Sequence, residues 1–192
     1  MRFFVLVFLF LSAAQTGTCA SRDQTIIHVA AGSYQIDDGT HHLVGSRTAI
    51  GLKHFWDENW AWFANLEQGT VAQKFRAENQ LSYLLEAQTT GLTAGVEWRQ
   101  PLGKRKKVIP FVGLGLNGLS YEMDYTYPGS SVGKTSGVGF GPLFRGGARF
   151  VLGRNFILIP AYQYSAVQIQ TEAGANKMIV SSGFFVGLVA VF

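Results

Sequence analysis

A two-residue alternation of apolar and polar side chains runs through this chain and limits the folds that it can adopt. In the segment 43–56, Ile50 and Leu52 fall on one parity, and Arg47 and Lys53 fall on the other. Successive side chains of a strand point to opposite faces, so this period predicts strands with one apolar and one polar face. Eight such segments are expected, at 25–36, 43–56, 60–69, 83–100, 108–123, 137–152, 156–169 and 178–192.

Composition decides what these strands face. Only 15% of the 192 residues are charged and 47% are hydrophobic, whereas soluble domains average about a quarter charged residues. After the N-terminus, no segment approaches the roughly 20 consecutive apolar residues that a spanning helix needs. A soluble sandwich would alternate in the same way, but its polar face would be richer in lysine and glutamate. We therefore expect an all-β fold, a closed eight-stranded antiparallel transmembrane β-barrel.

The N-terminus has the pattern of a cleaved secretory signal peptide. A basic residue at Arg2 precedes an unbroken apolar run from Phe3 to Leu11, followed by small and polar residues up to Ala20. This order of regions is typical of secretory signals. Residues 1–20 are predicted to be the signal and 21–192 the barrel domain. Lipoprotein processing at Cys19 is the alternative.

Turn signals divide into two kinds. Tight turns are expected at 57–59 and 153–155, with a slightly longer one at 101–107. The connections near 37–42, 70–82, 124–136 and 170–177 are polar and generally longer. Short turns on one rim and long loops on the other are typical of outer-membrane barrels. We expect a bacterial outer-membrane location, with periplasmic termini and extracellular long loops.

Aromatic residues predict two interfacial girdles. All four tryptophans lie beside the tight turns: Trp56, Trp60, Trp62 and Trp98. Four tyrosines lie at the loop ends of their strands: Tyr34, Tyr83, Tyr121 and Tyr164. Amphipathic rings gather at both membrane interfaces.

The charged faces of the strands are expected to point inward, because a charge facing lipid near the midplane costs about 2–4 kcal/mol. An eight-stranded barrel is only wide enough for side chains to fill. We predict an interior polar network of Arg47, Lys53, Asn65, Glu67, Glu97, Arg99, Asn117, Arg145, Arg149 and Gln163. Each glutamate should touch an arginine or lysine and so help plug the barrel. Inward charges separated by water are the alternative.

The end of the chain is apolar and aromatic. Its alternate residues Phe184, Val186, Leu188, Ala190 and Phe192 are predicted to form a lipid face. The segment resembles the C-terminal assembly signal of outer-membrane proteins. The expected partners are therefore periplasmic chaperones, the barrel-assembly machinery, and outer-membrane lipid and lipopolysaccharide, with a possible extracellular surface ligand.

Several stretches resemble the small OmpA-like outer-membrane β-barrel superfamily. The segment 109–115, Ile-Pro-Phe-Val-Gly-Leu-Gly, looks like its recurring proline–aromatic–glycine strand. The segments 146–150, 153–155 and 162–165 look like its last hairpin. This resemblance implies eight strands around a narrow polar interior. Members include adhesins, structural anchors and small channels, so the resemblance does not fix the function.

Three motifs are candidates for ligand chemistry. Gly113, Gly115 and Gly118 match a dinucleotide fingerprint, but that motif must open a helix and here the pattern continues as a strand. The pair His41-His42 lacks a third ligand at metal spacing, so an exposed polar loop is the favoured interpretation. The basic run 104–107 comes with no nucleic-acid recognition motif. We expect no cofactor, no metal site and no nucleic-acid partner.

One enzymatic alternative is a hydrolase that modifies lipid A. Outer-membrane deacylases carry a His-x-Ser arrangement late in the barrel, and Ser165 lies in a comparable place. Gln163 stands where the histidine would be, and an amide cannot accept the serine proton. The favoured function is non-enzymatic: a structural, surface-interaction or narrow-conductance barrel with a largely plugged interior.

Overall fold

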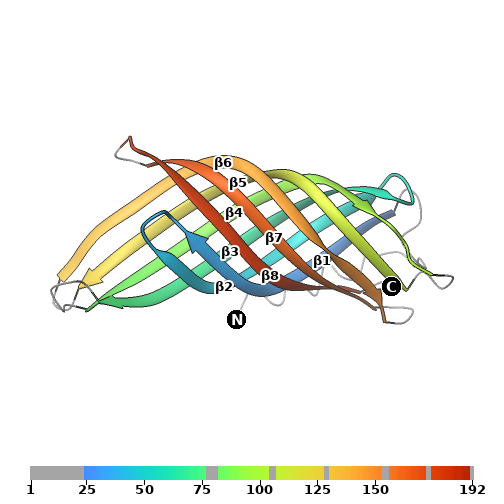
Figure 1. Cartoon of the computed structure of the whole chain (residues 1–192), viewed down its shortest axis with the longest axis horizontal. Coiled ribbons are helices and arrows are strands. Elements are labelled where there is room, and N and C mark those ends of the chain that lie inside the picture. The colour runs from blue at the N-terminus through green and yellow to red at the C-terminus, as the bar shows by residue number, and fades with distance from the viewer. Residues whose placement is uncertain are drawn as a thin grey trace.

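The computed structural model of the protein describes residues 24–76, 82–103, 107–127, 130–152, 156–171 and 174–190. Its strands are β1 (Gln24–Asp37), β2 (His42–Phe55), β3 (Trp60–Arg76), β4 (Ser82–Arg99), β5 (Val108–Tyr127), β6 (Ser130–Val151), β7 (Phe156–Thr171) and β8 (Asn176–Ala190). They form one closed barrel in sequence order (Figure 1). The predicted all-β, eight-stranded antiparallel barrel is confirmed. Within the described ranges, no helix is long and apolar enough to cross a membrane.

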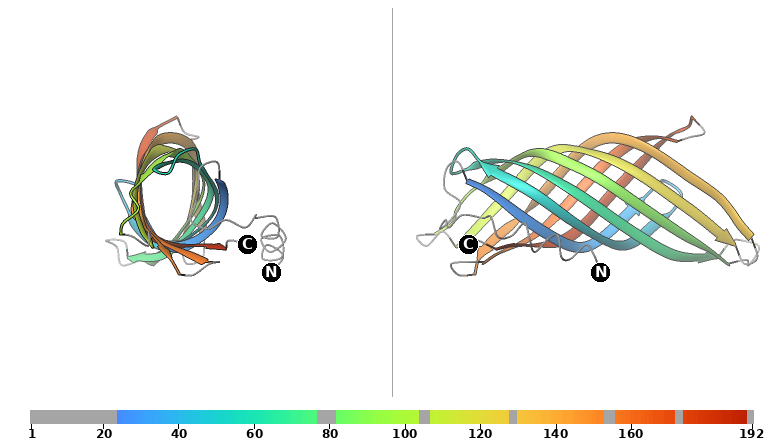
Figure 2. Two further views of the ribbon diagram at one scale, coloured as in Figure 1. Left: turned by 90° about the vertical axis from the view of Figure 1, so that its right-hand side faces the viewer. Right: turned by 180° about the vertical axis from the view of Figure 1, so that it is seen from behind.

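The first and last strands close the ring. Val29 of β1 lies opposite Leu188 of β8, and Ile36 lies opposite Ser181. Between these pairs the Ser33 hydroxyl donates to the carbonyl oxygen of Phe184 and accepts a hydrogen bond from its backbone N–H at 3.1 Å. A side chain thus joins β1 to β8 midway along this seam. Closure pairs strands on both sides, which removes free sheet edges, and the end-on view in Figure 2 shows the resulting ring.

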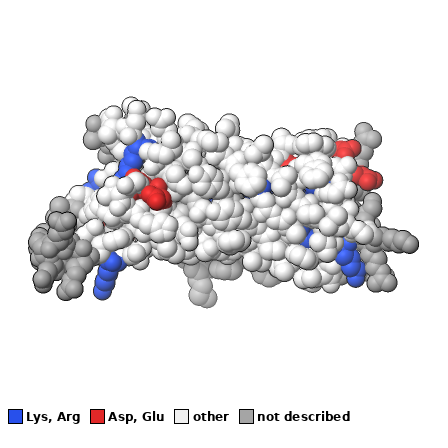
Figure 3. Space-filling view, in the orientation of Figure 1, with Lys and Arg blue, Asp and Glu red and all other residues white. Residues whose placement is uncertain are grey.

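The predicted parity of the strands is confirmed. Large apolar side chains are exposed on the outer wall, with 55% exposure at Leu66, 61% at Leu92 and 78% at Phe140. Figure 3 shows charged side chains at the two ends of the barrel and an almost uncharged wall between them. The side chains at the alternate positions of the strands are buried inside the barrel.

Strands on one side of the barrel are longer than predicted. β3 continues to Arg76, β5 continues to Tyr127 and β6 begins at Ser130. The loops predicted at 70–82 and 124–136 are therefore wrong in extent, because most of these residues belong to strands. The tight turn at 57–59 is confirmed, and Asp57 Oδ1 accepts a hydrogen bond there from the backbone N–H of Asn59 at 2.9 Å.

The reason for this error lies in the outward residues. Val71 is buried while its neighbours Thr70 and Ala72 are exposed, and Met123 is buried beside the exposed Glu122. The alternation thus continues, but its outer face is mostly polar and resembles a loop in composition.

These longer strands form a four-stranded extension, made of residues 72–76, 82–86, 122–127 and 130–136. The last pair between β2 and β3 is Gly45 with Val71, and the last between β6 and β7 is Gly137 with Thr171. Beyond these pairs, β3 to β6 pair only with one another. The extension projects at the end of the barrel opposite the tight turns (Figure 1).

The tryptophan and tyrosine predictions have different outcomes. All four tryptophans are about 40% exposed on the outer wall beside the turns, as predicted. The tyrosine girdle is wrong for Tyr34 and Tyr121, which are each 2% exposed and point inward. Both share the inward parity of their strands, so nearness to a loop end was a poorer guide than parity. Tyr164 is exposed on the outer wall.

Some predictions fall outside the described residues. These are the signal peptide at 1–20, the turn at 153–155, the basic residues 104–106 and the terminal Phe192.

Candidate functional site in the barrel interior

The ten side chains of the predicted polar network are all buried inside the barrel, each with 7% exposure or less. The structure divides them into two clusters around the two glutamates and leaves Arg99 and Asn117 apart from both. We call the half of the interior nearer the tight turns the turn half, and the other the loop half.

Glu97 is the centre of the cluster nearest the turns. Its Oε2 atom lies 2.7 Å from Lys53 Nζ and 3.9 Å from Arg145 Nε, and its Oε1 atom accepts a hydrogen bond from Arg149 Nη2. These residues come from β2, β4 and β6, so the cluster ties distant parts of the wall together. Three cations around one carboxylate leave positive charge in excess.

Glu67 is the centre of the second cluster. It accepts hydrogen bonds from Arg47 Nη1, from Thr93 Oγ1 and from Gln163 Nε2, each at 3.1 Å. Every donor to this carboxylate is itself buried. A buried carboxylate is tolerated only when paired and hydrogen bonded, and Glu67 meets both conditions.

Two predicted members do not join these clusters. Arg99 Nε donates to the backbone carbonyl of Glu58 at 2.7 Å, at the turn rim. Asn117 Nδ2 donates to Ser165 Oγ at 2.9 Å, and Ser165 in turn lies 2.8 Å from Ser181 Oγ. This smaller chain of polar groups lies in the loop half.

Inward aromatic rings are functional neighbours that the sequence analysis missed. The Arg145 guanidinium carbon lies 4.6 Å from the ring centroid of Phe63, and Lys53 Nζ lies 4.8 Å from that of Phe111. Ring faces attract cations within about 6 Å. These rings therefore offset part of the positive excess. Parity could have found them, because Phe63 shares the face of Asn65 and Glu67.

Three inward glycines make room for this packing. A Cβ atom at Gly51 would lie 2.1 Å from Asn65 Oδ1, and one at Gly69 would lie 2.5 Å from the Tyr34 ring. One at Gly113 would lie 2.9 Å from Arg145 Cγ. Gly113 belongs to the suspected dinucleotide fingerprint, which lies wholly within β5 and opens no helix. These glycines accommodate large neighbours, as in other strands where side chains approach closely.

The loop half of the interior is mostly apolar, which the sequence analysis did not predict. Its buried cluster, here called the apolar layer, comprises Tyr34, Ile36, Leu43, Val71, Leu85, Ala87, Leu119, Tyr121, Met123, Val167, Ile169 and Ile179. All eight strands except β6 contribute to it. The inward parity continues through Val71 and Met123 into segments whose outer residues are polar, so the sequence composition there predicts loops and conceals this layer.

The β1–β2 connection covers this layer at the mouth. Asp38 is 3% exposed and accepts a hydrogen bond from Lys177 Nζ at 2.6 Å. Burial works to raise the pKa of the Asp38 carboxyl, but Lys177 and the backbone N–H groups of His41 and Thr40 outweigh it, so the pKa is lowered. The carboxylate therefore stays ionised and fastens this connection to β8.

His41 does not lie in an exposed loop, so that interpretation was wrong. Its ring is wedged among Phe75, Tyr83 and Tyr125, with centroid distances of 5.4, 6.4 and 6.1 Å. His42 remains exposed. Among the residues that the structure describes, no group of three potential ligands could hold a metal ion.

Ser165 is the serine that the hydrolase alternative would use as its nucleophile. Ser165 is fully buried inside the barrel, where its hydroxyl contacts Asn117 and Ser181. Neither an amide nor a hydroxyl acts as the base that a serine nucleophile needs.

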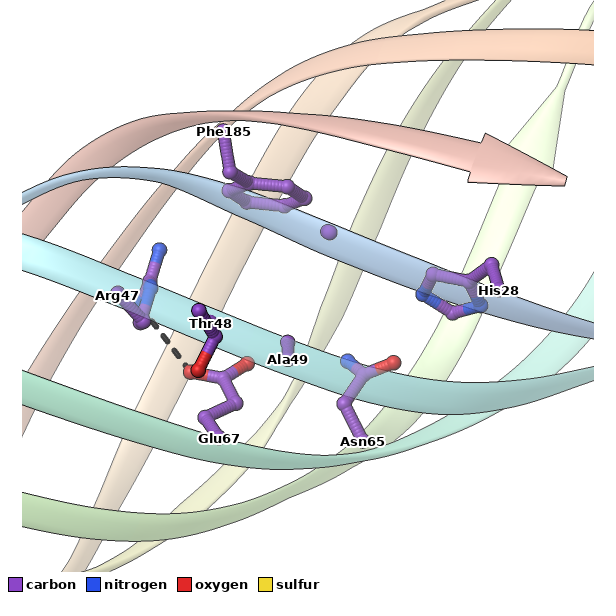
Figure 4. Close-up of a pocket in the computed structure, with 8 residues that line it drawn as sticks. His28, Arg47, Thr48, Ala49, Asn65, Glu67 and Phe185 are labelled. Atoms are coloured by element: carbon purple, nitrogen blue, oxygen red, sulfur yellow. Dashed lines mark hydrogen bonds and ion pairs between the residues drawn. The ribbon is translucent and has the colours of Figure 1, made fainter. Parts of the chain in front are cut away.

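A small cavity lies beside the Glu67 cluster. It offers about 10 Å³ of space, roughly enough for one water molecule. Its lining includes His28, Arg47, Asn65, Glu67 and Phe185. Figure 4 shows Arg47 and His28 on opposite sides of this space, with the Phe185 ring closing a third side.

Several solved structures share this fold. The outer-membrane protein OprG of Pseudomonas aeruginosa aligns with a TM-score of 0.61 at 10% identity, covering 88% of this chain and 97% of that chain. Ail, the attachment invasion locus protein of Yersinia pestis, aligns with a TM-score of 0.54 at 14% identity over 88% of this chain and 98% of that chain. Neisserial surface protein A gives a TM-score of 0.54 at 13% identity over 88% and 97%. No protein-family model and no curated protein sequence matches the chain.

These structural alignments show a shared fold, but at such low sequence identity they do not transfer a function. The chain therefore has the fold of the small, eight-stranded outer-membrane β-barrels, as its resemblance to the OmpA-like superfamily implies.

Proposed function

We propose that this protein is a non-enzymatic outer-membrane barrel with a closed interior, which acts as a scaffold at the cell surface. The observation that carries the proposal is the interior itself. Two charged clusters lie in the turn half together with a second apolar cluster that includes Phe55, Phe111 and Phe185, and the apolar layer occupies the loop half. An apolar layer of this kind would oppose the passage of hydrated ions.

The outer wall supports the membrane location. Apolar side chains cover its middle, and the four exposed tryptophans mark the interface beside the turns. In this orientation the turns, the start of β1 and the end of β8 face the periplasm, and the extension faces outward. Strands of 14 to 22 residues exceed the roughly 9–11 residues that cross a bilayer, so the extension has length to project beyond it.

The extension is the candidate contact surface for an extracellular partner. Ail has been crystallised in complex with the heparin analogue sucrose octasulfate. The outer face of this extension differs from what a sulfated ligand needs, because the exposed acids Glu86, Glu122 and Asp124 outnumber the exposed lysines Lys74 and Lys134, and Lys134 is paired with Glu122 at 3.1 Å. A neutral or basic surface fits this face better than a polyanion.

The proposal of no enzymatic activity rests on Ser165, whose burial and amide partner leave it without an activating base. Lipid A from cells with and without the protein should have identical acyl chains by mass spectrometry. Loss of one acyl chain on expression would replace this proposal with the hydrolase.

Conductance tests the closed interior. Purified, folded protein in a planar bilayer should show no steady single-channel current, while a porin added to the same bilayer serves as the positive control. A reproducible current whose amplitude scales with salt concentration would overturn the scaffold in favour of a narrow channel. Fractionation of cells should place the protein in the outer membrane.

A further inference from the structure

We infer that one side of the barrel, the outer wall over β1, β2 and β3, thins the membrane next to it. Lipid headgroups and water of the leaflet at the mouth reach hydroxyl and amide side chains on this wall. The inference rests on the membrane location in the proposed function and adds to it that the two sides of the barrel meet the lipid differently. Three observations carry it: a polar patch on the wall, the climb of the strand register, and the unequal height of the apolar wall.

The first observation is a patch of uncharged polar side chains on the outer wall. This polar patch consists of Ser33, Gln35, Ser46, Thr48, Gln68 and Thr70, which are all exposed. Ser33 on β1 lies opposite Ser46 on β2, which in turn lies opposite Thr70 on β3, so the patch is continuous across the three strands. Hydrocarbon offers no hydrogen-bond partners to hydroxyl and amide groups, whereas lipid headgroups and water do.

The second observation is the climb of the register around the barrel. The row of pair partners that starts at Ile26 on β1 passes through all the other strands and returns to β1 at Ile36. Rows of partners therefore climb toward the mouth from β1 to β8. Neighbouring strands lie about 4.8 Å apart and tilt by roughly 40°, so each step between strands raises a row by about 3 Å.

This climb brings a polar and an apolar residue to the same height on different sides of the barrel. The row of partners from Leu52 on β2 reaches Leu116 on β5 after three steps between strands, which place Leu116 about 9 Å above Leu52. Thr48 lies four residues nearer the mouth than Leu52 on β2, which raises it by about 10 Å. At this common height, β5 presents a leucine that is 65% exposed and β2 presents a hydroxyl.

The third observation is the height of the apolar wall on these two strands. On β2, the outward apolar run between His54 and Thr48 has only two residues. On β5, the outward positions from Val108 up to Ser120 are all apolar or glycine. Six residues of a tilted strand cover about 15 Å of height and twelve cover about 30 Å, whereas outer-membrane barrels typically have an apolar band of about 25 Å. The wall over β2 is therefore too low for an undistorted bilayer.

Thinning of the bilayer accommodates this difference better than tilting of the whole barrel. β6 lies across the barrel from β2, and a tilt that lifted the polar patch out of the hydrocarbon would push the turn end of β6 into water. Phe150 is 37% exposed at that end of β6, and Phe156 on the neighbouring strand is 51% exposed. Local thinning carries a modest cost per Å of mismatch, which is smaller than that of leaving several polar groups without partners in hydrocarbon.

Spin-label accessibility in lipid vesicles tests the inference. A nitroxide is attached to Thr48→Cys or to Leu116→Cys in the full chain, otherwise free of cysteine and folded in dioleoyl phosphatidylcholine vesicles. Oxygen, which partitions into hydrocarbon, and a water-soluble nickel chelate are then compared as relaxation agents. The label at Thr48→Cys should be severalfold more accessible to the nickel chelate than the label at Leu116→Cys, although the two sites lie at the same height.

The other outcomes separate the alternatives. Labels at both sites that meet oxygen and not nickel would overturn the inference and leave the membrane location intact, whereas labels at both sites that meet nickel would contradict the membrane location itself. A label at Phe150→Cys should meet mainly oxygen, and nickel access there equal to that at Thr48→Cys would replace thinning with a tilted barrel. A label at Thr48→Cys that is shielded from both agents would replace the lipid with a second copy of the chain.

Discussion

The two halves of the interior are stabilised in different ways. In the turn half, two carboxylates collect arginine, lysine, amide and hydroxyl donors, and aromatic rings cover the remaining cations. In the loop half, the apolar layer packs with little more than a short hydroxyl and amide chain beneath it. The same two-residue alternation produces both halves, so one barrel interior combines a charged and an apolar region.

The two halves should respond differently to the loss of a side chain. Buried ion pairs give weak net stability, yet loss of one partner is severe because the other charge is stranded. An apolar layer instead loses stability in proportion to the atoms removed. Substitutions in the two halves should therefore differ in size and in response to added charge.

The largest loss of stability is expected from a substitution in the turn half. Glu97→Ala strands Lys53, Arg145 and Arg149 without their shared carboxylate, and should lower the free energy of unfolding by about 4 kcal/mol. Urea unfolding in lipid vesicles, followed by the mobility difference of boiled and unboiled protein, measures it. The control Glu122→Ala removes an exposed carboxylate in the extension and should change stability by less than about 1 kcal/mol. Equal losses in both variants would show that the Glu97 cluster is not a stability centre.

A somewhat smaller effect is expected in the loop half. Leu85 is fully buried in the apolar layer, and Leu85→Ala should cost about 3 kcal/mol through lost burial and a residual cavity. The same unfolding assay applies, with Leu92→Ala on the exposed outer wall as the matched control. In both detergent and lipid, the free energy of unfolding of Leu85→Ala should be lower than that of Leu92→Ala. The reverse order would refute the inward assignment of this strand face.

Removal of both charges of one ion pair in the turn half sharpens the comparison. Lys53→Met in the Glu97→Gln background removes both partners of one ion pair and should recover part of the stability lost in Glu97→Gln alone, because Lys53 is then no longer left without its carboxylate. A double-mutant cycle measures this coupling. Strict additivity of the two losses would show that Lys53 and Glu97 do not interact.

The smallest effect is expected at the mouth. The lowered pKa of Asp38 means that its contribution is present above the ordinary carboxyl pKa of about 3.9 and is lost as pH falls through the lower folded-state value. Asp38→Asn should cost about 1.5–2 kcal/mol at pH 7, at the lower end of the range for a hydrogen bond to a charged group. Wild type and variant should converge near pH 2. A gap that stays constant from pH 7 to pH 2 would exclude the carboxylate latch.

Much of the fold was predictable because the period of two is a direct consequence of strand geometry. Leu66 and Leu92 on the outside, with the tryptophans beside the turns, follow from parity and composition. The extension was not predictable in the same way, because Glu122 and Asp124 face water there and make strand composition resemble a loop.

The candidate site was likewise predictable only in part. Parity places Glu67 and Glu97 on the inward face, and the structure then determines which cation each one meets. That Lys53 pairs with Glu97 and Arg47 with Glu67 depends on strand tilt and register, which no local pattern encodes. The inward turn of Tyr34 depends equally on the space left by Gly69 on a strand two places away.

Thiol labelling tests most directly our proposal that solvent does not pass through the barrel. Ser165 is fully buried inside the barrel, while Gln168 on the same strand faces outward and is exposed. In folded protein, a small water-soluble thiosulfonate reagent should modify Gln168→Cys rapidly and leave Ser165→Cys unmodified until the barrel is unfolded. Labelling of Ser165→Cys at a rate near that of Gln168→Cys would contradict the closed interior.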